Sequence, residues 1–262
     1  MTDHSLSNRH VLITGAGTGI GAAIATAFVN AGARVSLAGR RREPLLALQK
    51  SVGDNSRTYV LADFDVTKEA KVKTGVETAR GAFGPIDILV NNAGEAPSAP
   101  FVKTDLATWD KAVAVNLTGT FLVTREIISD MIAKRAGRVI NIASTAGLVG
   151  YAYVSAYVAA KHGVVGLTRS LALEFARSGI TVNAVCPGYT ETPLLERAVD
   201  NIVAKTKRSS EEARAALAAS NPQGRLITPD EVAHAVLWLA SDAAGSITGQ
   251  ALAVAGGEVM VG

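Results

Sequence analysis

The regular alternation of short apolar runs with longer segments of helical periodicity constrains the fold most. Parallel strands need crossover connections, so this alternation predicts a doubly wound parallel sheet with helices on both faces. The 262 residues fit one α/β domain spanning 1–262. The expected strands are 10–14, 33–39, 57–64, 86–94, 137–144, 180–188 and 247–257. The expected helices are 19–31, 41–52, 67–83, 104–134, 153–179, one or two within 194–220, and 228–241.

One segment, at about 190–225, breaks this alternation. It is polar and rich in alanine, and it follows directly after the carboxyl end of a predicted strand. Doubly wound sheets bind their ligands at that edge. We therefore interpret this segment as an insertion beside a ligand site.

A glycine-rich turn joins the first predicted strand to the first helix. The stretch TGAGTGIG, residues 14–21, places Gly15, Gly17, Gly19 and Gly21 at alternating positions. Unpaired amides and the positive end of the helix dipole would face a ligand in this turn, and glycines would let a pyrophosphate approach the backbone. A tight strand–helix turn without a ligand remains an alternative, because the spacing is G-x-x-x-G-x-G rather than G-x-G-x-x-G.

Composition argues against several classes of function. The net charge is only +3 and aromatic residues make up 5% of the chain, so no base-stacking nucleic-acid surface is expected. No apolar run of membrane-spanning length occurs, and the polar start, MTDHSLSNRH, argues against a secretory signal. Cys186 is the only cysteine, which fits a reducing, cytoplasmic location. The four histidines lack metal-ligand spacing, so we expect no metal.

Polar and small residues gather where the later predicted strands end. They are NNAG at 91–94, Ser144, and Pro187-Gly188, with Asn116, Tyr157 and Lys161 on the intervening helices. Together with T-G-x-x-x-G-x-G and Y-x-x-x-K, these motifs resemble the short-chain dehydrogenase/reductase family over nearly the whole chain. The resemblance implies a Rossmann-type sheet with strand order 3-2-1-4-5-6-7. It also implies an oxidoreductase that transfers hydride between a nicotinamide cofactor and a ketone or secondary alcohol.

The chemistry of the predicted catalytic residues follows from their spacing. Tyr157 and Lys161 are four residues apart and share a helix face, so the ammonium should lower the tyrosine pKa from near 10. Tyr157 is then the general acid in reduction and the base in oxidation. Ser144 would hydrogen-bond the substrate oxygen, although a strand-end hydroxyl can instead bond the backbone. The resemblance implies that Lys161 also holds the nicotinamide ribose and that Asn116 kinks its helix and holds a water.

The resemblance also assigns cofactor contacts: phosphates to the glycine turn, adenine to Asp65, ribose to Asn92 and carboxamide to Thr190 and Thr192. Asp65 could alternatively cap the helix after Val66. The complete predicted set is Gly15, Gly17, Thr18, Gly19, Ile20, Arg40, Asp65, Val66, Asn92, Gly94, Tyr157, Lys161, Pro187, Gly188, Thr190 and Thr192.

Arg40 favours NADP(H) over NAD(H). Gly39 stands where NAD-binding folds place an acid near the end of the second strand, so no carboxylate would repel a 2′-phosphate, and the guanidinium of Arg40 suits one. Two observations oppose this preference. Thr18 replaces the basic residue of many NADP-using relatives, and the run Arg40–Arg42 could be a solvated helix start.

The expected substrate is a 3-oxoacyl thioester or another bulky ketone. The lid, 191–227, resembles those of two subgroups, the 3-oxoacyl and polyketide ketoreductases and the D-3-hydroxybutyrate dehydrogenases. A free hydroxy acid is the disfavoured alternative, because its carboxylate would find no cation and could meet Glu95. Lid residues Lys205, Lys207 and Arg208 could meet the phosphate of acyl-CoA or an acyl carrier, or form a solvated helix face. The predicted substrate contacts are Glu95, Ala146, Leu148, Tyr151, Val154, Tyr189, Leu194 and Leu195.

Two other functions, an isomerase or dehydratase and a nucleotide sensor, fit the same fold. An isomerase or dehydratase would need an extra acid–base group, for which Glu95 is the weak candidate. A non-catalytic nucleotide sensor usually loses the Tyr or the Lys, and this chain keeps both. We expect a homotetramer formed through helices 104–134 and 153–179 and the last strand. The apolar residues that suggest it include Phe121, Val165, Leu167 and Leu171.

Overall fold

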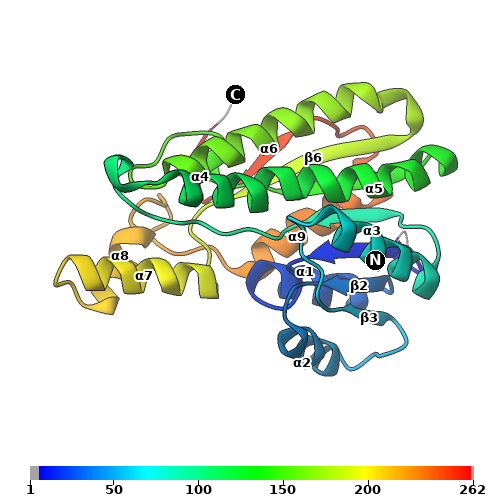
Figure 1. Cartoon of the computed structure of the whole chain (residues 1–262), viewed down its shortest axis with the longest axis horizontal. Helices are drawn as coiled ribbons and strands as arrows, with labels where there is room; N and C mark the ends of the chain where they lie inside the picture. The colour runs from blue at the N-terminus through cyan, green and yellow to red at the C-terminus, as the bar shows by residue number, and fades with distance from the viewer. Residues whose placement is uncertain (1–5, 261–262) are drawn as a thin grey trace.

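The computed structural model describes residues 6–260 and has at its centre a seven-stranded sheet of order β3-β2-β1-β4-β5-β6-β7 (Figure 1). Every neighbouring pair of strands is parallel, as the alternating sequence pattern requires. The predicted fold class and strand order are therefore confirmed. The strands are β1 His10–Thr14, β2 Arg34–Ala38, β3 Thr58–Leu61, β4 Ile88–Asn91, β5 Gly137–Ile142, β6 Ile180–Pro187 and β7 Ala251–Val254.

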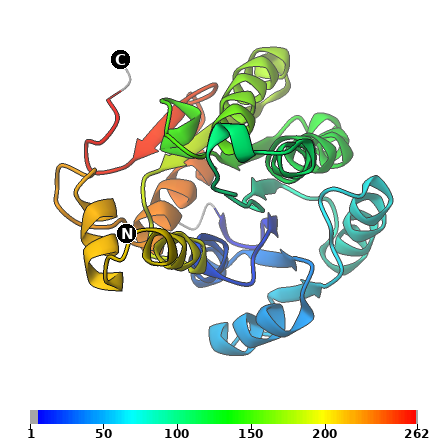
Figure 2. The same ribbon diagram turned by 60° about the vertical axis from the view of Figure 1, so that its left-hand side comes forward.

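Helices cover both faces of the sheet and bury its apolar side chains. One layer holds α1, α2 and α9, whose core residues include Ile24, Leu45 and Val236. The other holds α3, α5 and α6, with Val76, Ile127 and Ala172 in its core, and α4 packs on α6. Figure 2 shows these two layers on either side of the sheet. The helices are α1 Gly19–Asn30, α2 Arg42–Val52, α3 Glu69–Phe83, α4 Leu106–Val113, α5 Gly119–Lys134, α6 Ser155–Glu174, α7 Pro193–Lys205, α8 Ser210–Ala218 and α9 Pro229–Ala240.

Several predicted element bounds need correction. Strands β3 and β4 end at Leu61 and Asn91 rather than at 64 and 94, and α6 ends at Glu174 rather than at 179. The helix expected over 104–134 is divided into α4 and α5 by a π-helical turn, Ala114–Thr118, which contains Asn116. The last strand covers only Ala251–Val254 rather than 247–257, because glycines with positive φ angles stand both before it, at Gly249, and after it, at Gly256 and Gly257. Helix α6 begins at Ser155 rather than 153, since Tyr153 has a φ of 69°.

The segment after β6 forms two helices that project beyond the end of the sheet (Figure 1). Helix α7 begins at the cap residue Thr192, whose hydroxyl accepts a hydrogen bond from the amide of Leu195. Helix α8 begins with a capping box formed by Ser209 and Glu212. The two helices share a small apolar core of Leu195, Val199 and Ala213. None of the helices between residues 6 and 260 is long and apolar enough to cross a membrane.

Candidate active site

The glycines of the 14–21 turn are needed for different reasons. Gly15 and Gly19 adopt positive φ angles of 65° and 56°, which side chains other than glycine rarely adopt. A Cβ on Gly21 would lie 2.5 Å from Nδ2 of Asn92 and closer still to the carbonyl oxygen of Gly15. A Cβ on Gly17 would lie 2.9 Å from Cβ of Pro44 in α2. Internal packing and backbone shape therefore account for these glycines, and the amides of the first turn of α1 remain at the sheet edge.

Asn92 ties this turn to the end of β4. Its Nδ2 donates to the carbonyl oxygens of Thr14 and Gly15, at 3.0 and 3.1 Å. The hydroxyl of Thr14 in turn accepts hydrogen bonds from the amides of Asn92 and Ala93, both at 3.0 Å. The Asn92 amide group thus holds the glycine turn in place, a role that the sequence analysis did not assign to it.

Tyr157, Ser144 and Lys161 converge at the carboxyl edge of the sheet. Tyr157 and Lys161 lie on α6, and Nζ of Lys161 is 5.7 Å from the centre of the Tyr157 ring. Ser144 follows β5, and its hydroxyl is close enough to the Tyr157 side chain to favour the phenolate and so lower the tyrosine pKa. The same Ser144 oxygen accepts a hydrogen bond from the amide of Ala146 at 3.1 Å. The Ser144 hydroxyl thus makes the backbone bond that the sequence left open, at a position beside Tyr157.

Burial governs the proton affinities of this group. Burial raises the pKa of Tyr157, and the hydroxyl of Ser144 offsets part of that rise. Burial also lowers the pKa of Lys161 to about 8. The expected lowering of the tyrosine pKa is therefore wrong for the chain's own groups, because desolvation exceeds any effect of the ammonium. Nζ of Lys161 instead donates a hydrogen bond to the carbonyl oxygen of Ile142 at 2.7 Å.

Asn116 is completely buried in the π-helical turn. Its Nδ2 donates to the carbonyl oxygens of Glu95 and Ala112, both at 2.9 Å, and its Oδ1 accepts from the amide of Glu95 at 3.3 Å. Asn116 therefore fixes the backbone that follows NNAG. A Cβ on Gly94 would lie 2.9 Å from Oδ1 of Asn116 and 3.7 Å from Nζ of Lys161, so only glycine leaves the space between these two side chains open.

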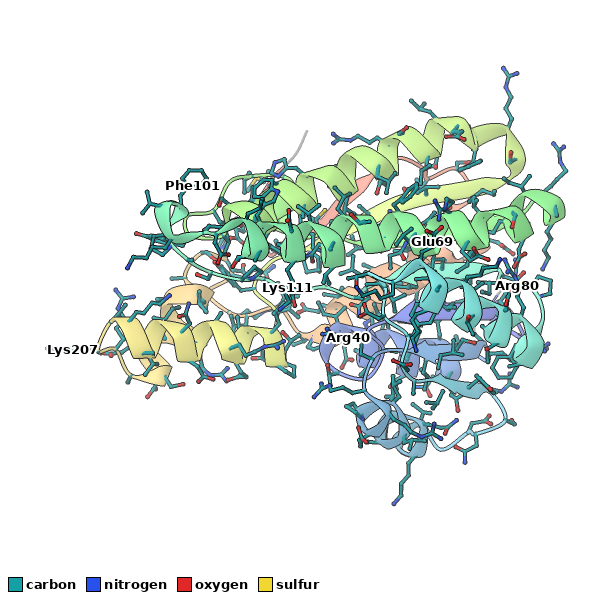
Figure 3. All side chains as sticks on the ribbon, viewed as in Figure 1. Arg40, Glu69, Arg80, Phe101, Lys111 and Lys207 are labelled. Atoms are coloured by element: carbon teal, nitrogen blue, oxygen red, sulfur yellow. The ribbon has the colours of Figure 1, made fainter. Side chains whose placement is uncertain are left out.

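Asp65 and Arg40 lie together beyond β2 and β3. The Asp65 carboxylate accepts hydrogen bonds from the amide and hydroxyl of Thr67, at 3.0 and 2.8 Å. Burial opposes ionisation of Asp65, but these bonds and the charges of Arg40 and Lys68 hold its pKa below the ordinary value. Asp65 caps a local turn rather than α3, which begins at Glu69. Arg40 is exposed, and Figure 3 labels it near the middle of that view.

The residues after β6 connect the sheet to the lid. The Thr190 hydroxyl donates to the carbonyl oxygen of Gly188 at 2.9 Å, and Thr192 donates to that of Thr190 at 3.2 Å. A Cβ on Gly19 would lie 3.1 Å from Cγ2 of Thr192, so the cap residue of α7 meets the glycine turn. Thr18 is exposed, and its side chain makes no capping hydrogen bond to α1. Ile20 is half-buried in the first turn of α1, while Val66 and Pro187 are buried.

The predicted substrate contacts differ in how near they lie to Ser144 and in how exposed they are. Tyr151 and Tyr189 pack edge to face, with ring centres 6.3 Å apart, beside Thr145, the neighbour of Ser144. Leu195, by contrast, is buried within the lid core, which leaves Leu194 as the more accessible of the two leucines. Ala146 is buried, while Leu148 and Val154 are half-buried.

Glu95 is paired with a cation, which the sequence analysis did not foresee. Its Oε1 lies 3.2 Å from Nζ of Lys111 on α4. Figure 3 labels Lys111 in the space between α4 and α7. The expectation that a substrate carboxylate would find no cation near Glu95 is therefore wrong, and Glu95 is not by itself an argument against an anionic substrate.

Glu258 is the residue near this site that the sequence analysis missed. Its Oε1 accepts a hydrogen bond of 2.7 Å from the Tyr151 hydroxyl. The two residues are 107 positions apart, and Glu258 belongs to none of the recognised motifs, so no local pattern indicates the contact. Among residues 6–260, no group of three or more His, Cys, Asp or Glu side chains could hold a metal ion.

A parallel sheet with a glycine-rich first turn and a Ser–Tyr–Lys group at its carboxyl edge defines a nucleotide-dependent oxidoreductase. The model of the short-chain dehydrogenase family matches residues 9–202, and the chain belongs to this family. It is an NAD(P)-dependent oxidoreductase of that family.

Relatives cover almost the whole chain. A ketoacyl reductase assigned to the granaticin polyketide synthase of Streptomyces violaceoruber is 42% identical over 94% of this chain and 91% of its own length. The D-beta-hydroxybutyrate dehydrogenase of Rhizobium meliloti is 40% identical over 94% of this chain and 96% of its own length. The crystal structure of a single-substitution variant of actinorhodin polyketide ketoreductase with NADPH is 38% identical, with a TM-score of 0.92 over 96% of this chain and 97% of its own.

Proposed function

We propose that the protein is an NADP(H)-dependent ketoreductase acting on a bulky carbonyl substrate, such as a 3-oxoacyl thioester. The observation that carries this is the Ser144–Tyr157–Lys161 group beside the glycine turn. The similarity to an actinorhodin ketoreductase crystallised with NADPH and to a granaticin ketoacyl reductase supports the same reaction. Nicotinamide dinucleotide would supply or accept the hydride, and the chain's own residues would bind, orient and move the proton.

In this proposal each residue of the site has a defined part in the reaction. The hydroxyl of Ser144 donates a hydrogen bond to the carbonyl oxygen and orients it, and Tyr157 delivers its phenolic proton to the developing alkoxide. Because burial raises the Tyr157 pKa, the phenol is protonated at neutral pH, which suits reduction. Lys161, held by the Ile142 carbonyl, contributes positive charge beside the tyrosine and would bind the nicotinamide ribose. Asn116 keeps the Glu95 backbone and the Gly94 opening in place.

The substrate would enter under the lid formed by α7 and α8. Lid residue Lys207 lies at the outer tip of the lid (Figure 3), so a carrier phosphate would meet it only at the entrance. We place the protein in the cytoplasm, where its single, buried Cys186 would stay reduced.

Arg40 is proposed to select NADP(H) by binding the 2′-phosphate, since it is exposed and its charge acts on Asp65. Arg40→Ala should lower kcat/KM for NADPH about tenfold, because one charge-assisted bond is lost at an exposed position, and should leave that for NADH nearly unchanged. Steady-state kinetics with both cofactors measure this, and Arg42→Ala on the same run is the control. Equal use of both cofactors by the wild-type protein, or the same loss from Arg42→Ala, would contradict the assignment.

We further propose a homotetramer that buries apolar surface on α5 and α6 and the edge of β7. Phe121 is 42% exposed and Leu173 is 83% exposed. Phe121 also lines a groove of about 260 Å³ with Ile128, Leu171 and Phe175 and with the polar Thr124, Arg125 and Glu174, whereas Leu173 lies outside that groove. Val165, which the sequence analysis placed on this surface, is buried inside the protomer and cannot contribute.

Light scattering should therefore give a mass about four times that of the 27.0 kDa chain at micromolar concentration. Leu173→Asp should lower that mass without lowering the stability of the fold, because the side chain is exposed in the protomer. A stable 27.0 kDa species in the wild-type protein would sink the proposal.

A further inference from the structure

Glu258 reaches the substrate side of the site because the chain reverses after β7. Gly256 and Gly257 have φ angles of 58° and 92°, and the amide of Glu258 closes the turn onto the carbonyl oxygen of Ala255 at 3.1 Å. A Cβ on Gly256 would lie 2.6 Å from Cγ of the buried Asn221, at the end of the lid. The segment bearing Glu258 is therefore clamped between the sheet edge and the lid.

The Glu258 carboxylate lies close to the reacting residues without contacting them. The Tyr151 hydroxyl is within hydrogen-bond distance of Oε1 of Glu258, at 2.7 Å, and of the Thr145 hydroxyl, at 2.9 Å. Thr145 directly follows Ser144. A Cβ on Gly188, at the end of β6, would lie 2.9 Å from the other Glu258 oxygen. Burial raises the pKa of Tyr151 and of Tyr189, and the negative charge of Glu258 raises both pKa values further. The charge of Glu258 does not contribute to the raised pKa of Tyr157.

The Glu258 charge is not compensated by a neighbouring cation. In the part of the chain that the structure describes, no Lys, Arg or His nitrogen lies within 4.0 Å of it, whereas Glu95 is paired with Lys111. Its hydrogen-bond partner is the neutral hydroxyl of Tyr151. An uncompensated, half-buried carboxylate repels anions more strongly than one in bulk water, and it accepts hydrogen bonds from neutral donors.

We propose that Glu258, oriented by Tyr151, is a specificity-determining residue that acts on the end of the substrate remote from the reacting carbonyl. It excludes substrates that carry a carboxylate at that end, and it favours neutral substrates that carry a hydrogen-bond donor there. This rests on the proposed ketoreductase function and narrows its substrate class. It gives a physical reason why this chain should not use a hydroxy acid, a reason that the paired Glu95 does not provide.

Two ketones of nearly the same shape test the inference. They are 4-oxocyclohexanecarboxamide, which is neutral and carries an N–H donor, and 4-oxocyclohexanecarboxylate, which is an anion. With NADPH, the wild-type kcat/KM should favour the carboxamide at least about tenfold. Glu258→Gln keeps an oxygen that accepts from Tyr151 but removes the charge, so the ratio should fall to within about threefold of one, mainly because the carboxylate is used better.

The controls separate charge from structure. Glu77→Gln removes one exposed charge on α3 and should leave the ratio unchanged. Thermal unfolding of Glu258→Gln should match the wild type, because the bond to Tyr151 can still form. A ratio that Glu258→Gln leaves unchanged would overturn the inference and leave the proposed function standing. A wild-type protein that reduces neither these ketones nor a 3-oxoacyl thioester would contradict the proposed function, and the inference with it.

Discussion

Tyr157→Phe is expected to lower kcat for ketone reduction by about 10²–10⁴-fold, the range that general acid–base catalysis supplies. The ring that packs beside Ser144 and Lys161 remains, but the transferable proton is lost. Because burial keeps the Tyr157 pKa high, the phenol carries its proton at neutral pH, and phenylalanine has no proton to transfer. NADPH should still bind, since the glycine turn and Arg40 are unchanged.

Steady-state turnover and a fluorescence titration with NADPH separate the two effects. Tyr153→Phe is the matched control, because Tyr153 lies four positions earlier, is 65% exposed and has no lysine four residues after it. That variant should keep wild-type turnover. Near-wild-type turnover of Tyr157→Phe would show that the mechanism is wrong, whereas loss of NADPH binding would show that the variant disturbs the site as a whole.

Gly21→Ala is expected to destabilise the fold by about 1–3 kcal/mol, the usual cost of overpacking a tight site. The added methyl group would be forced against the Gly15 carbonyl oxygen and Nδ2 of Asn92, the atoms whose hydrogen bond holds the glycine turn. The turn must therefore move, and affinity for NADPH should fall with it. Chemical denaturation and the NADPH titration measure the two losses.

Gly81→Ala provides the opposite result from the same chemical change. Gly81 is an exposed helical residue of α3, and a Cβ there would meet nothing within 4 Å. Replacing it should stabilise the protein by about 0.5–1 kcal/mol through the better helix propensity of alanine, and NADPH binding should not change. If Gly21→Ala were as stable as the wild type, the close packing of the glycine turn would be refuted.

Much of the architecture follows from short-range pattern. The alternation of apolar runs and helical segments predicts the parallel sheet, and the T-G-x-x-x-G-x-G and Y-x-x-x-K motifs predict the family and the strand order. These predictions succeed because strand and helix periodicities are local and because parallel strands allow few crossover arrangements. The π-helical turn at Asn116 was expected only as a kink implied by the family resemblance, since its residues fit an ordinary helix.

What the sequence by itself determined was the fold class, the class of reaction and the side chains that gather at the carboxyl edge of the sheet. Only the tertiary structure decided how those side chains interact. It paired Glu95 with Lys111, used the amide of Asn92 to hold the glycine turn, and desolvated the half-buried Tyr157 so that its pKa rises. It also brought Glu258 to Tyr151 across 107 positions. Desolvation and long-range contacts depend on what packs around a group in space, and a linear pattern records only what lies beside it in the chain.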